Sequence, residues 1–170
     1  MDDIFKPEEK KRGVNKVIVV ALIAALGMVA VAIYLLSLKP PMVDQTAKIM
    51  EGSLREGSPE FALANKDVII GTDLDNTVES PTGLGTISMY IKGNVRNRGT
   101  RNIIALEVNV AVITQKNEVL REKIVLVVPM QHKSLPPGAS IPITLDIPGF
   151  SSKDDRANIR WKVTAIKFAQ

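Results

Sequence analysis

Residues 17–38 form an uninterrupted apolar segment that constrains the rest of the chain more than any other feature. The segment reads VIVVALIAALGMVAVAIYLLSL and contains no charged side chain. At about 1.5 Å per residue, a helix of this length spans roughly 33 Å, enough to cross a bilayer core about 30 Å thick. We therefore predict one transmembrane helix, anchored in the lipid bilayer by residues that include Val17, Leu22, Leu26, Val31, Leu35 and Leu38.

The flanking charges predict the orientation of this helix. Only Lys39 follows it directly, whereas four basic residues closely precede it: Lys10, Lys11, Arg12 and Lys16. Because basic residues resist translocation, we expect residues 1–16 to be a cytoplasmic tail and the rest of the chain to be exported. In a bacterium, this topology is that of a single-pass inner-membrane protein with a periplasmic or extracellular C-terminal domain.

A cleaved signal peptide is the alternative, because a basic region, an apolar core and the small residues Ala30 and Ala32 are all present. The apolar segment is, however, longer than the roughly 7–15 residues of a typical signal peptide core. The chain contains no cysteine, which excludes a disulfide and a lipid attachment of the lipoprotein kind. An exported domain without disulfides fits a bacterial envelope. The favoured interpretation is an uncleaved anchor.

Residues 39–60 read KPPMVDQTAKIMEGSLREGSPE and are rich in turn residues. Pro40 and Pro41 are expected to end the transmembrane helix, and the glycine and serine content argues against a packed core. We therefore predict a juxtamembrane linker, within which residues 46–54 form either a short helix or a short strand. The folded domain is expected to span residues 61–170.

Beyond residue 60, short segments alternate apolar and polar side chains, with the period of two that is typical of half-buried strands. A polar loop containing Gly99 predicts an antiparallel hairpin between residues 87–95 and 104–112, with the glycine in a left-handed conformation. A second hairpin is expected through residues 115–118. The predicted strands are residues 66–71, 87–95, 104–112, 119–128, 140–147 and 159–168.

Amphipathic strands of this kind bury their apolar faces by stacking as two sheets. The predicted fold class is therefore mostly β: an antiparallel immunoglobulin-like β-sandwich behind one N-terminal transmembrane α-helix. Trp161, flanked by Ile159 and Val163, is expected at the centre of the core. The adjacent apolar residues Ala165 and Ile166 interrupt the alternation and indicate a β-bulge.

Side chains suited to catalysis are few. His132, the single histidine, falls in a predicted loop, and neither Ser80 nor Ser88 has the glycine context of a nucleophile elbow. We therefore predict a protein that is not an enzyme and has no catalytic residue, cofactor or metal. A weak calcium site at Asp73, Asp75, Thr77 and Glu79 is the minor alternative; these residues lack the glycine and glutamate positions of an EF-hand.

Four basic residues gather around the first predicted loop and form the candidate interaction patch: Lys92, Arg96, Arg98 and Arg101. Arginine side chains suit phosphate and carboxylate groups, which favours an anionic lipid, a cell-wall polymer or an acidic protein as the partner. The simpler alternative is that these charges keep the end of a hairpin soluble. The net charge of only +4 argues against a nucleic-acid partner.

The run of residues 93–103, GNVRNRGTRNI, followed by LPPG at residues 135–138, resembles bacterial FxLYD-like domains over residues 61–168. The resemblance implies an immunoglobulin-type sandwich, often behind a single N-terminal anchor, in families of unknown function. It implies no catalytic residue. The chain departs from the family at residues 110–114, where VAVIT replaces the F-x-L-Y-D signature.

Together these features predict a non-enzymatic, single-pass membrane-anchored binding or assembly module of the bacterial cell envelope, with envelope proteins as partners. The alternative is a structural subunit of an envelope secretion or pilus-type machine, in which the anchor helix itself makes essential contacts. Small residues on one face of the anchor, among them Ala21 and Ala25, leave self-association open.

Overall fold

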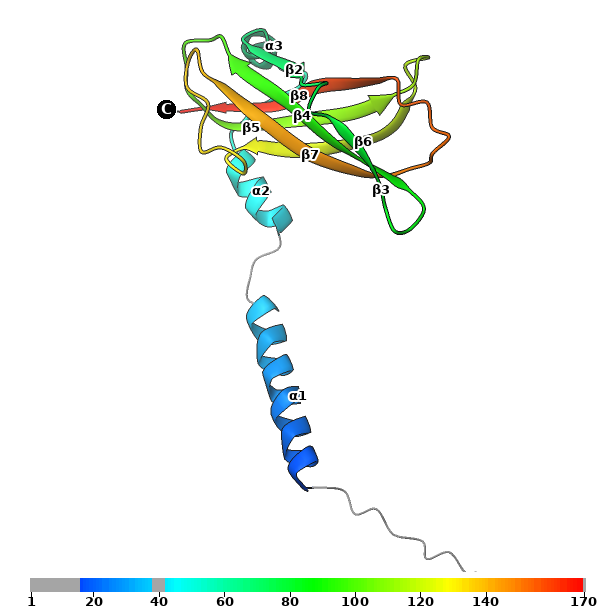
Figure 1. Cartoon of the computed structure of the whole chain (residues 1–170). Coiled ribbons are helices and arrows are strands. Elements are labelled where there is room, and N and C mark those ends of the chain that lie inside the picture. Colours follow the sequence, from blue (N-terminus) through cyan, green and yellow to red (C-terminus); the bar gives the residue numbers. More distant parts are fainter. Residues whose placement is uncertain (1–15, 38–41, 170) are drawn as a thin grey trace, which may run out of the picture. The chain divides into compact units, whose positions relative to one another are not determined.

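The computed structural model describes residues 16–37 and 42–169. Its helices are α1 (Lys16–Ser37), α2 (Met42–Met50) and α3 (Pro59–Asn65). Its strands are β1 (Leu54–Arg55), β2 (Val68–Thr72), β3 (Val78–Pro81), β4 (Ile87–Asn97), β5 (Ile103–Ile113), β6 (Val119–Val128), β7 (Ser140–Phe150) and β8 (Asn158–Phe168). The chain divides into two compact units, one containing α1 and one beginning at Thr46 (Figure 1).

The α1 helix is apolar around its whole circumference. Its side chains from Val17 to Leu35 are all exposed, and this stretch is long and apolar enough to cross a membrane. Exposed apolar side chains on every face of a helix favour an apolar environment, as in a membrane anchor or a signal sequence. The predicted anchor residues Val17, Leu22, Leu26, Val31 and Leu35 lie on α1, whereas Leu38 lies outside the described residues.

The domain consists of two antiparallel sheets. The β5 sheet has the strand order β1-β8-β5-β6. In the β4 sheet, β4 is central and pairs with β2 and β3 along one edge and with β7 along the other. This architecture confirms the predicted antiparallel sandwich with one N-terminal apolar helix (Figure 1). Within that class, the immunoglobulin-like topology stays a prediction.

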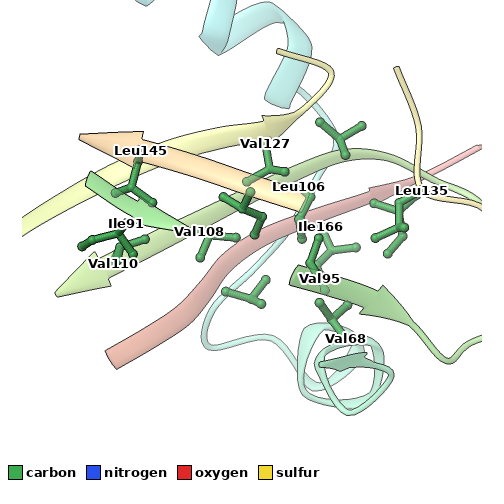
Figure 2. Close-up of a cluster of buried hydrophobic side chains, with 14 of the residues drawn as sticks. Val68, Ile91, Val95, Leu106, Val108, Val110, Val127, Leu135, Leu145 and Ile166 are labelled. Atoms are coloured by element: carbon green, nitrogen blue, oxygen red, sulfur yellow. The ribbon is translucent and has the colours of Figure 1, made fainter. Parts of the chain in front are cut away.

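The period-two alternation of the strands produces the core between the sheets. On β4, Met89, Ile91 and Val95 are buried, whereas Tyr90 and Arg96 are exposed. Burying one such apolar side chain contributes about 1.5–3 kcal/mol relative to leaving it in water. Side chains from both sheets meet in this layer (Figure 2), among them Val68, Leu106, Val108, Val110, Val127, Leu145 and Ile166, and Leu135 of the β6–β7 connection joins them.

The predicted hairpin between residues 87–95 and 104–112 is wrong. β4 and β5 belong to different sheets, and residues 98–102 form an arch that carries the chain from one sheet to the other. Strand alternation shows which side chains are buried but not which strands pair, so both arrangements fit the sequence. The second predicted hairpin is confirmed, because β5 pairs with β6.

The predicted linker at residues 39–60 is wrong from Thr46 onward. Met50 is buried against Ala105, Leu126 and Ala165 on the outer face of the β5 sheet, and β1 pairs with β8. Isolated apolar residues among turn residues give no periodic signal, which is why the sequence concealed this packing. The domain therefore begins at Thr46 rather than at residue 61.

Trp161 lies at the margin of the core and not at its centre. Its side chain is partly buried, and its indole Nε1 donates to Thr72 Oγ1 at 2.7 Å, which links β8 to β2. An indole N–H needs an acceptor when it leaves water, so the edge of the sandwich suits it better than the centre. The predicted bulge is present: β8 shifts register between Val163 and Ala165, opposite β5.

Candidate functional site

The arch between β4 and β5 is held by one buried polar side chain, Asn97, which is 1% exposed. Its Nδ2 donates to Arg101 O at 2.8 Å and to Leu135 O at 3.0 Å, and its Oδ1 accepts from Gly99 N at 3.0 Å. The bond to Gly99 is local, within the arch itself. The bond to Leu135 joins segments far apart in the chain, which the sequence did not reveal.

Gly99 does not adopt the left-handed conformation predicted for it, because its backbone φ is not positive. It serves close approach instead: a Cβ at this position would lie 2.9 Å from Asp67 Oδ2. The neighbouring Arg98 N donates to Asp67 O at 2.7 Å. The arch is therefore fixed from both sides, by Asn97 and by the residue that precedes β2.

The structure separates the four residues of the candidate interaction patch into two groups. Lys92 and Arg96 lie on the outer face of β4, and Arg98 is exposed in the arch. Lys92 Nζ lies 5.9 Å from the centroid of the Tyr90 ring. We call Lys92, Arg96 and Arg98 the β4 basic row; in the described part of the chain, none of them forms an ion pair.

Arg101, the fourth patch residue, is oriented toward the β5 sheet. Its guanidinium carbon lies 3.7 Å from the centroid of the Phe168 ring on β8, within the range of a cation–π contact. No carboxylate pairs with it among the described residues. Arg101 therefore belongs to a different surface from the β4 basic row.

Two grooves share the turn formed by Glu51 and Gly52, which follows α2; we call them the entry grooves. The larger, of about 790 Å³, is also lined by Leu54, Arg101, Ile104, Ile166, Lys167, Phe168 and Ala169. The smaller, of about 490 Å³, is also lined by Ala47, Lys48, Met50, Ser53 and Arg55. The entry grooves combine an apolar lining with basic side chains, a combination that sequence spacing did not predict.

The free edge of β7 is covered by the connection that follows β6. Gln131 pairs with the backbone of Thr144, donating to its oxygen at 2.9 Å and accepting from its nitrogen at 3.0 Å. His132 Nε2 lies 2.9 Å from Pro142 O. This role is structural, and it closes the edge of β7 to strand addition by another chain.

Two cations on β6 reinforce this closure. Lys123 Nζ donates to Asp146 O at 2.9 Å, and Arg121 Nη2 donates to Gly149 O at 3.0 Å. Both acceptors are backbone carbonyls of β7. Charged side chains that point toward a sheet edge are a common means of preventing edge-to-edge pairing. A partner is therefore more readily accommodated on a face of the domain than along β7.

The acidic residues of the β2–β3 region are not gathered into a metal site; in the described ranges, no group of three or more His, Cys, Asp or Glu side chains is placed to hold a metal ion. Asp73 accepts from Asn76 Nδ2 at 2.9 Å. Glu79 instead pairs with Arg156, whose Nε and Nη2 donate to its two oxygens at 2.8 and 2.9 Å.

This ion pair ties the β7–β8 loop to β3. Arg156 Nη1 also donates to Ser151 O at 2.6 Å. The hydrogen bond from Arg156 holds the pKa of Glu79 below its ordinary value of 4.5, against a smaller opposing effect of burial. The same hydrogen bond raises the pKa of Arg156. Glu79 is thus occupied by a structural contact.

Comparisons with known proteins leave the function open. No family model matches the chain, and no curated protein matches it. A crystal structure of a protein named ApaA, from Bordetella pertussis, is similar with a TM-score of 0.35 and 16% identity, over 48% of this chain and 67% of that chain. A TM-score of 0.35 supports no conclusion about fold or function. The resemblance to FxLYD-like domains stays a prediction.

Proposed function

We propose that this chain is a non-enzymatic, membrane-anchored binding or assembly module of the bacterial cell envelope. In this proposal α1 crosses the inner membrane once, residues 1–16 lie in the cytoplasm, and the domain that begins at Thr46 lies outside. The exposed apolar surface of α1 supports the anchor. The preceding basic residues support the orientation.

The observation that carries the binding role is the β4 basic row on a rigid support. β4 is the central strand of its sheet, and Asn97 at its end is locked by hydrogen bonds to two other segments. Side chains on such a support lose less conformational freedom on binding than side chains on a mobile loop. Since these cations lack ion-pair partners in the described structure, they are available to the carboxylates of an acidic protein surface.

The test is crosslinking in living cells with a photoreactive residue at Asn94, which is exposed between Lys92 and Arg96 on β4. When the β4 basic row is unaltered, we expect the photoreactive residue to give one discrete crosslinked product with a protein partner. The double variant Lys92→Glu and Arg96→Glu should lose most of this product, because it places carboxylates opposite carboxylates.

The matched control is Lys116→Glu with Lys153→Glu, the same charge change at two exposed loop residues of the domain. This control should capture the partner as the unaltered chain does. Equal capture of the partner by the unaltered chain, the double variant and the control would exclude the β4 basic row as the binding surface.

A further inference from the structure

The entry grooves carry a strong excess of positive charge. Among the described residues that line them, Glu51 is the one acidic residue, against four basic residues: Lys48, Arg55, Arg101 and Lys167. None of these cations forms an ion pair with another described residue. The grooves therefore present an electrostatic field that favours anions.

Two of the cations are held in fixed positions. The Arg101 guanidinium stacks on the Phe168 ring with its carbon 3.7 Å from the ring centroid. Lys167 Nζ donates to Glu51 O at 2.6 Å and to Ile49 O at 3.3 Å, which leaves its positive charge at the shared turn. A guanidinium stacked on one face keeps its N–H groups free at the edge, where they suit phosphate oxygens.

The same grooves offer apolar surface beside the charges. Leu54, Ile104 and Phe168 are partly exposed and line the larger groove. A ligand that places an anionic group near Arg101 and apolar atoms a few ångströms away would contact both kinds of surface. Anionic phospholipids have this chemistry, since their phosphate is esterified to a glycerol that also carries the acyl chains.

With α1 spanning the bilayer as proposed, the length of the chain limits how far the entry grooves lie from that bilayer. Lys48 lies 11 residues after Ser37, the last residue of α1, and the second half of that interval belongs to α2. Five extended steps at about 3.5 Å and six helical steps at about 1.5 Å limit the separation of Ser37 and Lys48 to roughly 27 Å. Juxtamembrane Lys and Arg residues at this range are attracted to anionic lipid surfaces.

We propose that the entry grooves bind the phosphate headgroups of anionic phospholipids in the bilayer that holds α1. This contact fixes how the domain faces the membrane and leaves the β4 basic row available to a protein partner. It rests on the anchoring part of the proposed function but uses different residues from the proposed partner surface.

The experiment uses the full chain in lipid nanodiscs. Because the chain has no cysteine, Thr100→Cys gives a single dye site in the arch beside Arg101, and Ser152→Cys gives one in the β7–β8 loop. Energy transfer to an acceptor on lipid headgroups reports the distance of each dye from the bilayer. Phosphatidylcholine discs are compared with discs in which one lipid in three is phosphatidylglycerol.

We expect phosphatidylglycerol to raise transfer from the Thr100 site severalfold more than from the Ser152 site. Salt near 1 M, where the Debye length is about 3 Å, should abolish the rise. Lys48→Glu with Arg101→Glu should abolish it as well, whereas Lys116→Glu with Lys153→Glu should retain it. The emission of Trp161 checks that each variant is folded.

Equal transfer from the Thr100 site in both lipids would overturn the proposal, as would a rise that survives the Lys48 and Arg101 changes in folded protein. A chain that fails to enter the nanodiscs at all would contradict the anchor itself. The two failures are distinguished by whether the chain co-elutes with the discs.

Discussion

Gly93 lies beneath the indole of Trp161, at a position where the structure leaves no room for a side chain. A Cβ there would lie 2.8 Å from Trp161 Cζ2 and 2.8 Å from the backbone oxygen of Gly71. The backbone oxygen belongs to the paired strand β2 and cannot move away without breaking that pairing. Only glycine fits this close approach.

We expect Gly93→Ala to lower the free energy of unfolding by about 1–3 kcal/mol, as overpacking of a well-packed site does. The urea midpoint of the folded domain measures this loss. Gly71→Ala is the control, because the structure places nothing within 4 Å of a Cβ there. Equal midpoints for the two variants would contradict the placement of Trp161.

Asn97 is one of the two residues that hold the arch, together with Asp67. In Asn97→Ala, the buried carbonyl of Leu135 and the carbonyl of Arg101 lose their shared donor. We expect a loss of about 2–3 kcal/mol in the free energy of unfolding, together with faster amide exchange at Gly99. Asn94→Ala, at an exposed position of the same strand, should leave both unchanged. Unaltered Gly99 exchange in Asn97→Ala would show that the arch is held by other contacts.

The Glu79–Arg156 pair joins β3 to the β7–β8 loop and makes that junction sensitive to acid. Folding lowers the pKa of Glu79, so its contribution to stability is complete above its ordinary value of 4.5. The contribution is lost as pH falls through the lowered pKa. Because the Glu79 side chain is 42% exposed, we expect a contribution of less than about 1 kcal/mol.

Glu79→Gln should therefore be less stable than the unaltered chain at neutral pH, and the difference should vanish as the pH falls below the lowered pKa. Urea midpoints at several pH values measure this convergence. Glu118→Gln changes an exposed glutamate that has no ion-pair partner in the described structure, and it should show no such convergence. A Glu79→Gln difference that is constant with pH would contradict the assigned pairing.

Sequence periodicity predicted the longer strands but not β1 or β3, and it predicted the pairing of β5 with β6 but not the partners of β4. The alternation at Met89, Ile91 and Val95 correctly gave the buried face of β4. It did not show that β4 and β5 lie in different sheets, because the pairing partners of a strand are set by segments far away in the chain, such as β7 for β4 and β8 for β5.

The candidate sites are likewise predictable from the sequence only in part. The basic residues are evident as a cluster in the sequence, but the sequence does not show that Arg101 stacks on Phe168, 67 residues later in the chain, apart from the other three. The sequence does not predict the entry grooves, because Met50 and Leu54 lie in a segment with the composition of a linker. Single apolar residues between turns carry no period from which packing is predicted.

An exchange of the anchor helix separates the proposed function from its alternative. Replacing residues 17–38 with an unrelated transmembrane helix should preserve crosslinking at Asn94 if α1 is a tether. A structural subunit of a secretion or pilus-type machine needs its own helix contacts, so it should lose assembly in the exchanged chain. The comparison is made in the same cells, with membrane levels of both chains matched by immunoblot.

The most direct test of the account is the topology of the intact chain. With a C-terminal tag, protease added to spheroplasts should digest the domain that begins at Thr46 while cytoplasmic proteins stay intact. Without protease, the domain should fractionate with membranes. A cleaved signal peptide would instead leave the domain among the soluble periplasmic proteins. A domain that stays intact while a known periplasmic protein is digested would contradict the anchor, its orientation and the proposed envelope role.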